Sequence, residues 1–149
     1  MAKNVRITYN DNSAEVLNRF QKAVRNGLVA IGLTAETKAK KNITKNKSVD
    51  TGRLRNSITY AIAGEKPHVN TYKANKKNLS EKKLTTYSYD GIAEGKKNSA
   101  VYIGTNVEYA PDVEYRDIAH RTGKAHFLRD SMDKQKNTFK QIIDAAMKS

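Results

Sequence analysis

The sequence contains no cysteine, and that absence excludes several classes of protein. A disulfide scaffold, a zinc or iron–sulfur site with Cys ligands and a cysteine nucleophile all need thiols. The sequence also lacks long apolar runs, since the longest, at residues 28–33, is far shorter than the ~20 residues of a membrane-spanning helix. The first residues carry no apolar signal-peptide segment. These absences predict a soluble chain without a targeting segment.

Apolar residues are scarce and charged residues are abundant. Hydrophobic residues make up 38% and charged residues 29% of the 149 residues, which is polar for a globular domain but not for a disordered chain. The length suits one domain, 1–149, because single domains cluster at about 100–150 residues. Lys and Arg number 28 against 15 Asp and Glu, and the resulting net charge of +13 favours acidic partners.

A long helix near the amino terminus is the strongest structural signal. Apolar residues recur at steps of three and four and predict one buried stripe along a helix of roughly 25–30 residues, which frays at 42–48. The stripe consists of Val16, Leu17, Phe20, Val24, Leu28, Ile31 and Ala35. Asn12 and Glu15 resemble a capping box at its start. Gly27 and Gly32 either weaken the helix or admit a close neighbour.

Alternating apolar residues predict short strands on both sides of this helix. The expected strands are 5–9, 58–62, a segment near 85–92, and 100–105. In one of them, Ile58, Tyr60 and Ile62 share a face. After the last strand, the segment 107–110 is expected to end at Pro111.

A second apolar stripe predicts a helix that runs almost to the carboxyl terminus. It consists of Leu128, Met132, Gln135, Phe139, Ile142, Ile143 and Ala146. Residues from about 65 to 99 hold eight Lys and little aliphatic content, so we expect a Lys-rich hairpin arm or loop there. The predicted fold class is α+β, with a small antiparallel sheet packed against the long N-terminal helix and the C-terminal helix.

The tripeptide Asp50-Thr51-Gly52 is the one in which aspartic proteases carry a catalytic carboxylate. Basic residues on both sides, Lys47 and Arg53 among them, argue against a protease because they would lower the pKa of the carboxyl group and keep two paired copies ionised. We expect instead that Asp50 and Thr51 cap a short turn at 53–57, while Gly52 relieves backbone crowding.

Metal and phosphate sites are also poorly supported. His120 and His126 lie near Asp112, Glu114 and Asp117, but their spacing fits no usual ligand motif. The glycines are scattered singly, so the sequence has no glycine-rich phosphate-binding loop. We therefore expect no metal, no cofactor and no catalytic residue, and a protein that is not an enzyme.

The lysines cluster, and such clusters can neutralise phosphate groups. Sequence-specific nucleic-acid recognition is not expected, because base and bidentate phosphate contacts favour Arg over Lys. A solvated basic face is the favoured interpretation, and non-specific contact with DNA or with an acidic protein surface stays open. The candidate interaction surface consists of Lys73, Lys76, Lys77, Lys82, Lys83, Lys96 and Lys97.

Four short motifs follow one another in the order of a known family. They are Val49-Asp50-Thr51-Gly52-Arg53-Leu54-Arg55-Asn56-Ser57-Ile58, Val101-Tyr102-Ile103-Gly104-Thr105, Tyr109-Ala110 with Val113-Glu114, and Ala125-His126-Phe127-Leu128-Arg129. The chain thereby resembles the tail-completion, or head–tail joining, proteins of long-tailed bacteriophages. Two places depart from that pattern: Tyr-Arg-Asp at 115–117 replaces the common Phe-Gly-Thr, and His126 replaces a common proline.

The resemblance implies a structural protein of the virion neck or tail top, made in the cytoplasm of a host bacterium, that completes the tail and joins it to the head. It implies a ring, usually six-fold, whose partners are further copies of the chain, the connector or head-completion protein, and the tail-tube or tail-terminator protein. DNA in the lumen would be a non-specific contact, and no membrane is implied. A basic module that binds nucleic acid without sequence preference is the alternative.

The motif residues are expected to support the fold, and the loops and the Lys-rich arm are expected to contact partners. This fold signature consists of Asp50, Thr51, Gly52, Leu54, Ser57, Gly104, Thr105, Tyr109, Ala110, Glu114, Phe127 and Leu128.

Overall fold

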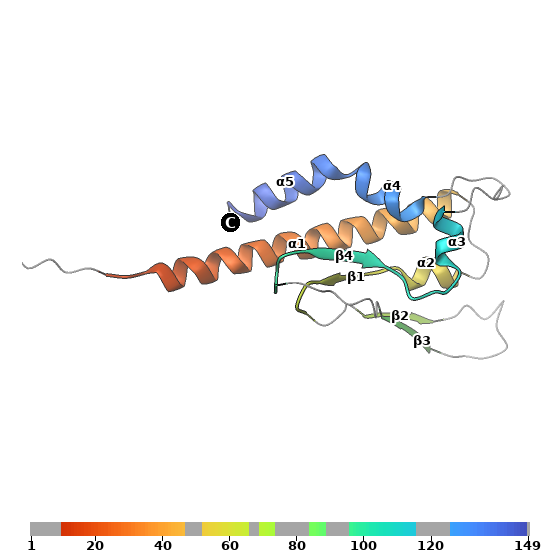
Figure 1. Ribbon diagram of the computed structural model, residues 1–149, viewed down its shortest axis with the longest axis horizontal. Coiled ribbons are helices and arrows are strands. Elements are labelled where there is room, and N and C mark those ends of the chain that lie inside the picture. Colours follow the sequence, from red (N-terminus) through yellow and green to blue (C-terminus); the bar gives the residue numbers. More distant parts are fainter. Residues whose placement is uncertain are drawn as a thin grey trace, which may run out of the picture.

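The computed structural model describes residues 10–46, 52–65, 69–73, 84–88, 96–115 and 126–148, with 69–73 and 84–88 described as backbone. The predicted fold class is confirmed: the chain is mixed α+β and mostly helical. One long helix, α1, contacts a two-stranded antiparallel sheet and, separately, the two C-terminal helices (Figure 1). The predicted strand at 5–9 lies outside the described residues.

Helix α1, Ser13–Lys45, has 33 residues and is therefore about 50 Å long. Its buried residues are Gly27, Ile31, Gly32, Ala35, Glu36, Ala39 and Ile43. The predicted stripe is thus confirmed in the second half of the helix, which also continues as far as Lys45. In the first turns the prediction of burial is wrong, because Val16, Leu17 and Phe20 are exposed.

The predicted capping box at the start of α1 is wrong. Asn12 is the N-cap residue, but its side chain makes no capping hydrogen bond, and its ψ of 13° is not the extended value usual for that role. The Asp11 Oδ1 atom accepts a hydrogen bond from the Ser13 amide instead, at 2.9 Å. Glu15 pairs with Arg19 one turn along the helix, at 2.6 Å.

Two glycines bring α1 close to its neighbours. A Cβ atom on Gly32 would lie 2.5 Å from Cδ2 of Tyr60, and one on Gly27 would lie 2.7 Å from Cδ1 of Ile143. Both distances are too short for real contacts. The glycines therefore admit close neighbours, which are the sheet at Gly32 and the last helix at Gly27. This confirms one of the two interpretations that the sequence allows.

The sheet that packs on α1 consists of β1, Thr59–Ile62, and β4, Val101–Gly104. The strands are antiparallel, with Thr59 opposite Gly104 and Ile62 opposite Val101. All four residues of β1 are buried, so this strand is covered on both faces. The strand predicted at 100–105 is confirmed by β4.

A second antiparallel pair lies within the Lys-rich segment. It consists of β2, Val69–Lys73, and β3, Leu84–Ser88, and the register places Val69 opposite Ser88. The pair fits the expected hairpin arm. The strand predicted near 85–92 is found slightly earlier, at β3.

The described residues form four further helices: α2, Arg53–Ser57; α3, Ala110–Tyr115; α4, Phe127–Asp133; and α5, Lys136–Ala146. The break predicted at Pro111 is wrong. Proline lies in the first turn of α3, where a missing backbone N–H group costs nothing because no helical carbonyl would accept it.

The single predicted C-terminal helix is divided at a turn. The Gln135 amide donates to the Met132 carbonyl, three residues back, at 3.2 Å, and α5 begins directly afterwards. Both α4 and α5 contact α1, so the turn redirects the chain while keeping its apolar stripe on the long helix.

The main core lies near the C-terminal end of α1. It consists of Ala39, Ile43, Leu54, Ile58, Val107, Ala110 and Phe127. Ile103, Tyr109, Val113 and Leu128 pack against it. The cluster thus joins α1, α2, α3 and α4 to Ile58, which directly precedes β1, and to Ile103 of β4.

The close approach of α1 and β1 predicts the effect of Gly32→Ala. We expect the free energy of unfolding to fall by about 1–2 kcal/mol, because overpacking costs about 1–3 kcal/mol and the gain in helix propensity is about 1 kcal/mol. Urea denaturation measures the change. Asn26→Ala, at an exposed position of the same helix, is the control and should be neutral or slightly stabilising. Equal stability of the two variants would contradict the close approach.

Candidate functional site

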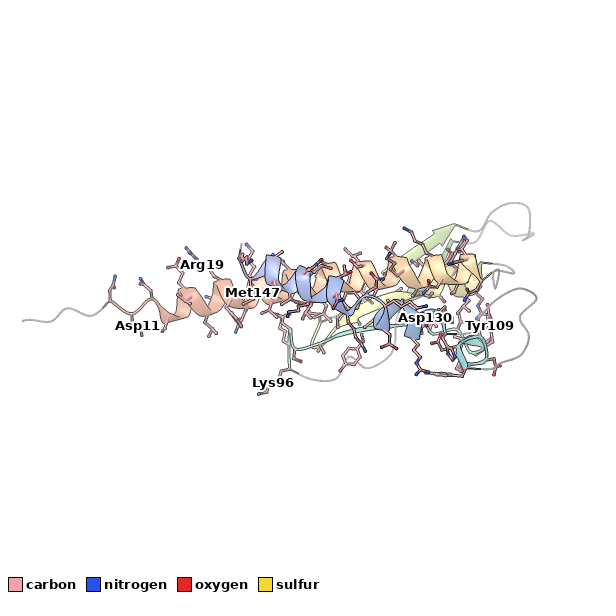
Figure 2. All side chains as sticks on the ribbon, turned by 90° about the horizontal axis from the view of Figure 1, so that it is seen from above. Asp11, Arg19, Lys96, Tyr109, Asp130 and Met147 are labelled. Atoms are coloured by element: carbon pink, nitrogen blue, oxygen red, sulfur yellow. The ribbon has the colours of Figure 1, made fainter. Side chains whose placement is uncertain are left out.

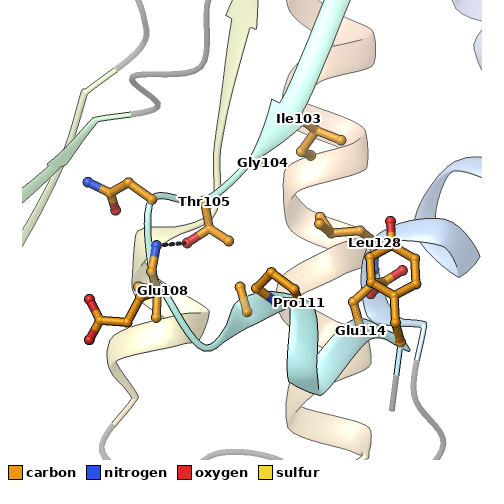
Figure 3. Close-up of a pocket in the computed structure, with 11 residues that line it drawn as sticks. Ile103, Gly104, Thr105, Glu108, Pro111, Glu114 and Leu128 are labelled. Atoms are coloured by element: carbon orange, nitrogen blue, oxygen red, sulfur yellow. Dashed lines mark hydrogen bonds between the residues drawn. The ribbon is translucent and has the colours of Figure 1, made fainter. Parts of the chain in front are cut away.

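A pair of hydroxyl groups joins the first motif to the second. Ser57, the last residue of α2, lies 2.5 Å from Thr105, the residue after β4, measured between their side-chain oxygens. The Ser57 hydroxyl donates to the Leu54 carbonyl at 2.8 Å, so the Thr105 hydroxyl donates to Ser57. The Thr105 oxygen also accepts a hydrogen bond from the Val107 amide at 3.2 Å (Figure 3). This chain of bonds fixes α2 to the loop that follows the sheet.

A buried carboxylate joins the third motif to the fourth. Glu114, in α3, is 3% exposed, and its two oxygens accept hydrogen bonds from the amides of Leu128 and Arg129, both at 2.9 Å. These amides belong to the first turn of α4, where no helical carbonyl is available. A negative charge also stabilises a helix N-terminus. Glu114 therefore caps α4 from another helix.

The N-cap residue of α4, His126, has the left-handed backbone conformation, with a φ of 73°. Proline fixes φ near −65° and is incompatible with this conformation. The His126 amide donates to the Glu114 carbonyl at 3.1 Å, a bond that proline would also lack. The departure from the family pattern at this position therefore coincides with a backbone that proline cannot adopt.

Gly52 precedes α2 and has a φ of 79°, a conformation that favours glycine. The next residue, Arg53, lies 3.4 Å from Glu108 and 6.0 Å from the centre of the Tyr109 ring. The first motif therefore contacts the third as well as the second. Asp50 and Thr51 lie outside the described residues, so their expected capping role stays a prediction.

The apolar signature residues form the centre of this junction. Leu54, Ala110 and Phe127 are buried in the core, and Leu128 packs against it. Asn42 of α1 donates a hydrogen bond to the Phe127 carbonyl at 3.1 Å. Gly104 ends β4, as expected. The structure therefore brings the described signature residues together at one end of α1, and we name this region the motif junction.

The candidate interaction surface is only partly described. Lys96 and Lys97 are exposed in a turn before β4, and that turn is tied to the end of β1 by a bond from the Asn98 amide to the Ala63 carbonyl, at 3.1 Å. Lys73 is the last residue of β2, described as backbone. Lys76, Lys77, Lys82 and Lys83 lie outside the described residues.

Sequence reasoning missed an ion pair between α1 and the turn after β1. The Arg25 guanidinium contacts both carboxylate oxygens of Glu65, at 2.6 and 3.0 Å. The hydrogen bonds from Arg25 lower the pKa of the Glu65 carboxyl group. Forty residues separate the two side chains, and no motif in the sequence links them.

Sequence reasoning also missed a groove of about 430 Å³ beside the motif junction, which we name the α3 groove. Its apolar lining comes from Ile103, Val107, Ala110, Pro111, Tyr115 and Leu128 (Figure 3). Tyr115 is 73% exposed, although most large apolar side chains nearby are covered. The sequence contains no pattern that predicts this groove, because a single tyrosine at the end of a short helix is not a recognisable motif.

In the part of the chain that the structure describes, no three His, Asp or Glu side chains are grouped so that they could hold a metal ion. His120 lies outside the described residues. Among the described helices, none is long and apolar enough to cross a membrane.

No protein-family model, curated protein or solved structure matches this chain. The resemblance to phage tail-completion proteins therefore rests on the motif residues and their order. The structure adds how those residues contact one another.

The buried cap predicts a marked loss of stability in Glu114→Ala. We expect the free energy of unfolding to fall by about 2–3 kcal/mol, because two helix amides lose their acceptors and the buried side chain leaves a cavity. Glu114→Gln keeps the shape and one acceptor and should lose less. Glu108→Ala, at a side chain that is 78% exposed, is the matched control and should change stability by less than about 0.5 kcal/mol. A Glu114→Ala loss no larger than the control would refute the cap.

The hydroxyl pair predicts energetic coupling between Ser57 and Thr105. Each of Ser57→Ala and Thr105→Val should lower the free energy of unfolding by about 1–2 kcal/mol, and the double variant should lose about 0.5–1.5 kcal/mol less than the sum. A double-mutant cycle in urea measures this. Strict additivity would show that the two hydroxyls act independently.

Proposed function

We propose that this protein is a structural component of the neck or tail top of a long-tailed bacteriophage, where it completes the tail and joins it to the head. It assembles with copies of itself, and its motifs hold the fold that presents the assembly surfaces. The proposed role is structural, since the chain binds neighbouring proteins and performs no catalysis.

The observation that carries the proposal is the mutual contact of the four motifs. Ser57 of the first motif binds Thr105 of the second, and Glu114 of the third caps the helix that begins at Phe127 in the fourth. A single short motif can match a family pattern by chance. Four motifs that follow the family order and also contact one another are less easily explained by chance. Leu54, Glu114 and Phe127 are buried, which fits a protein whose motifs maintain a scaffold.

The distribution of charge fits protein contacts better than base recognition. Four of the described arginines, Arg19, Arg25, Arg53 and Arg129, have a carboxylate within 4.0 Å. Lysines supply most of the remaining positive charge, and a lysine is a point charge without the bidentate geometry that reads base edges. The net charge of +13 nevertheless favours one second candidate, a module that coats nucleic acid without sequence preference.

The test of the proposal is electron microscopy of a lysate from a phage or prophage in which this reading frame carries an early stop codon. Filled heads lying apart from tails, or tails with defective upper ends, are the expected result. Wild-type protein supplied from a plasmid should restore joined particles and is the control. Normal joined particles without the protein would contradict the proposal.

A DNA-binding measurement distinguishes the second candidate function from the first. A coating protein binds any duplex, and its affinity falls with salt at a slope of about −0.9 per phosphate contacted. A neck protein binds an assembled tail or connector and binds DNA only weakly.

A further inference from the structure

The first turns of α1 extend beyond the other helices and strands that the structure describes (Figure 1). Residues 13–22 are all exposed, and we name them the α1 overhang. Figure 2 shows Arg19 in this part of the helix, beyond both Met147 and Lys96. Val16, Leu17 and Phe20 are 63%, 56% and 52% exposed, and they lie together on one surface of the helix. Monomeric proteins rarely leave such a contiguous apolar patch in water.

The exposed patch continues a stripe that is covered elsewhere. Val16 and Phe20 are four residues apart, and the same period leads through Val24 to Gly27, where α5 packs closely on α1 through Ile143. The helix α5 ends there, so the stripe loses its cover. The same face of α1 therefore packs against α5 near Gly27 and is exposed at Val16 and Phe20.

The α3 groove lies toward the opposite end of the molecule. Val107 and Ala110 line it and belong to the core cluster around Ile43, near the end of α1. Leu17 and Ile43 are roughly 40 Å apart along the helix at 1.5 Å per residue. Because α1 is one continuous helix, the overhang of a chain cannot reach its own groove. A contact between the two surfaces needs two copies.

The two surfaces also carry complementary charge. Glu108, at the groove, and Asp112, on α3, are exposed carboxylates in a chain whose net charge is +13, and Glu108 lies 3.4 Å from the exposed Arg53. On the overhang, Lys22 is exposed beside Phe20, and Arg19 pairs with Glu15 at 2.6 Å, so residues 13–22 together keep one net positive charge. Two copies of so basic a protein repel each other in most orientations, whereas this orientation places basic side chains against an acidic rim.

We infer that the α1 overhang of one copy docks in the α3 groove of the next copy. The contact joins different surfaces of the two copies, so it is heterologous, and repeating it closes a ring or extends a filament. Val16, Leu17 and Phe20 supply the apolar contact, and the exposed Tyr115 covers them from the groove side. The inference rests on the self-assembly in the proposed function and names the surfaces that perform it.

The absence of cysteine allows a direct test by cross-linking in the full-length chain. Ala14→Cys marks the overhang, Asn106→Cys marks the rim of the groove, and both positions are exposed. The two variants are purified with tags of different size, mixed, and treated with a short bismaleimide cross-linker. We expect the mixed dimer to be the main product. The control partner is Asn137→Cys, an exposed position on α5 away from the groove, which should give at least tenfold less mixed dimer with Ala14→Cys.

A second change tests the apolar contact itself. Adding Leu17→Ser to Ala14→Cys should reduce the mixed dimer at least tenfold, and because Leu17 is exposed the fold should be unaffected, as circular dichroism can verify. Three results would overturn the inference: dimers formed mainly between two Ala14→Cys chains, equal cross-linking to Asn106→Cys and Asn137→Cys, or no cross-linking at about 0.5 mM protein. The experiment uses purified protein alone, so its failure leaves the neck role to the lysate microscopy.

Discussion

The Glu114 carboxylate is the constraint on which the arrangement of the helices depends. It is buried, and a buried charge is costly unless hydrogen bonds compensate it. The amides that donate these hydrogen bonds belong to the first turn of α4. The position of α3 therefore determines where α4 begins. Phe127 then enters the core, and the chain that follows runs back along α1. A single side chain thereby fixes the direction of the whole C-terminal region.

The hydroxyl pair of Ser57 and Thr105 performs the same task on the other side of the core. It joins α2 to the loop that leads into α3, so the two polar contacts bracket the apolar cluster around Ile43 and Phe127. The molecule is consequently asymmetric. One end holds the motif junction, in which side chains are buried and hydrogen-bonded, and at the other end the described residues form a single helix with an exposed apolar surface. Head-to-tail assembly of identical chains joins two different surfaces, and the two ends of this molecule differ from each other.

The sequence was sufficient for the elements with strong periodicity. The stripe of α1 was predicted because each buried residue follows the last by three or four positions, and Gly52 was assigned to a turn because of its chemistry. The exposed start of α1 was not predicted, since the pattern continues there and only the length of α5 determines where the cover ends. The turn at Gln135 was missed for a related reason: the apolar stripe passes through it without a glycine or proline.

The candidate site was predictable as a set of residues but not as a set of contacts. The family resemblance selected Ser57, Thr105 and Glu114, yet their partners lie 48, 14 and 15 residues away in the chain. Local patterns carry no information about such distant pairs. Local reasoning also misled at Pro111, where a residue that usually ends a helix lies in the first turn of one.

The central claim is that the motif junction is rigid, while none of the described residues of the same chain covers the α1 overhang. Amide hydrogen exchange, measured by NMR at a dilution where the protein is monomeric, tests it most directly. The account predicts that the amides of Leu128, Arg129 and Val107 exchange only on global unfolding, while those of residues 17–22 exchange at least a hundredfold faster. Equal protection of the overhang and of residues 31–43, or rapid exchange at Leu128 and Arg129, would contradict it.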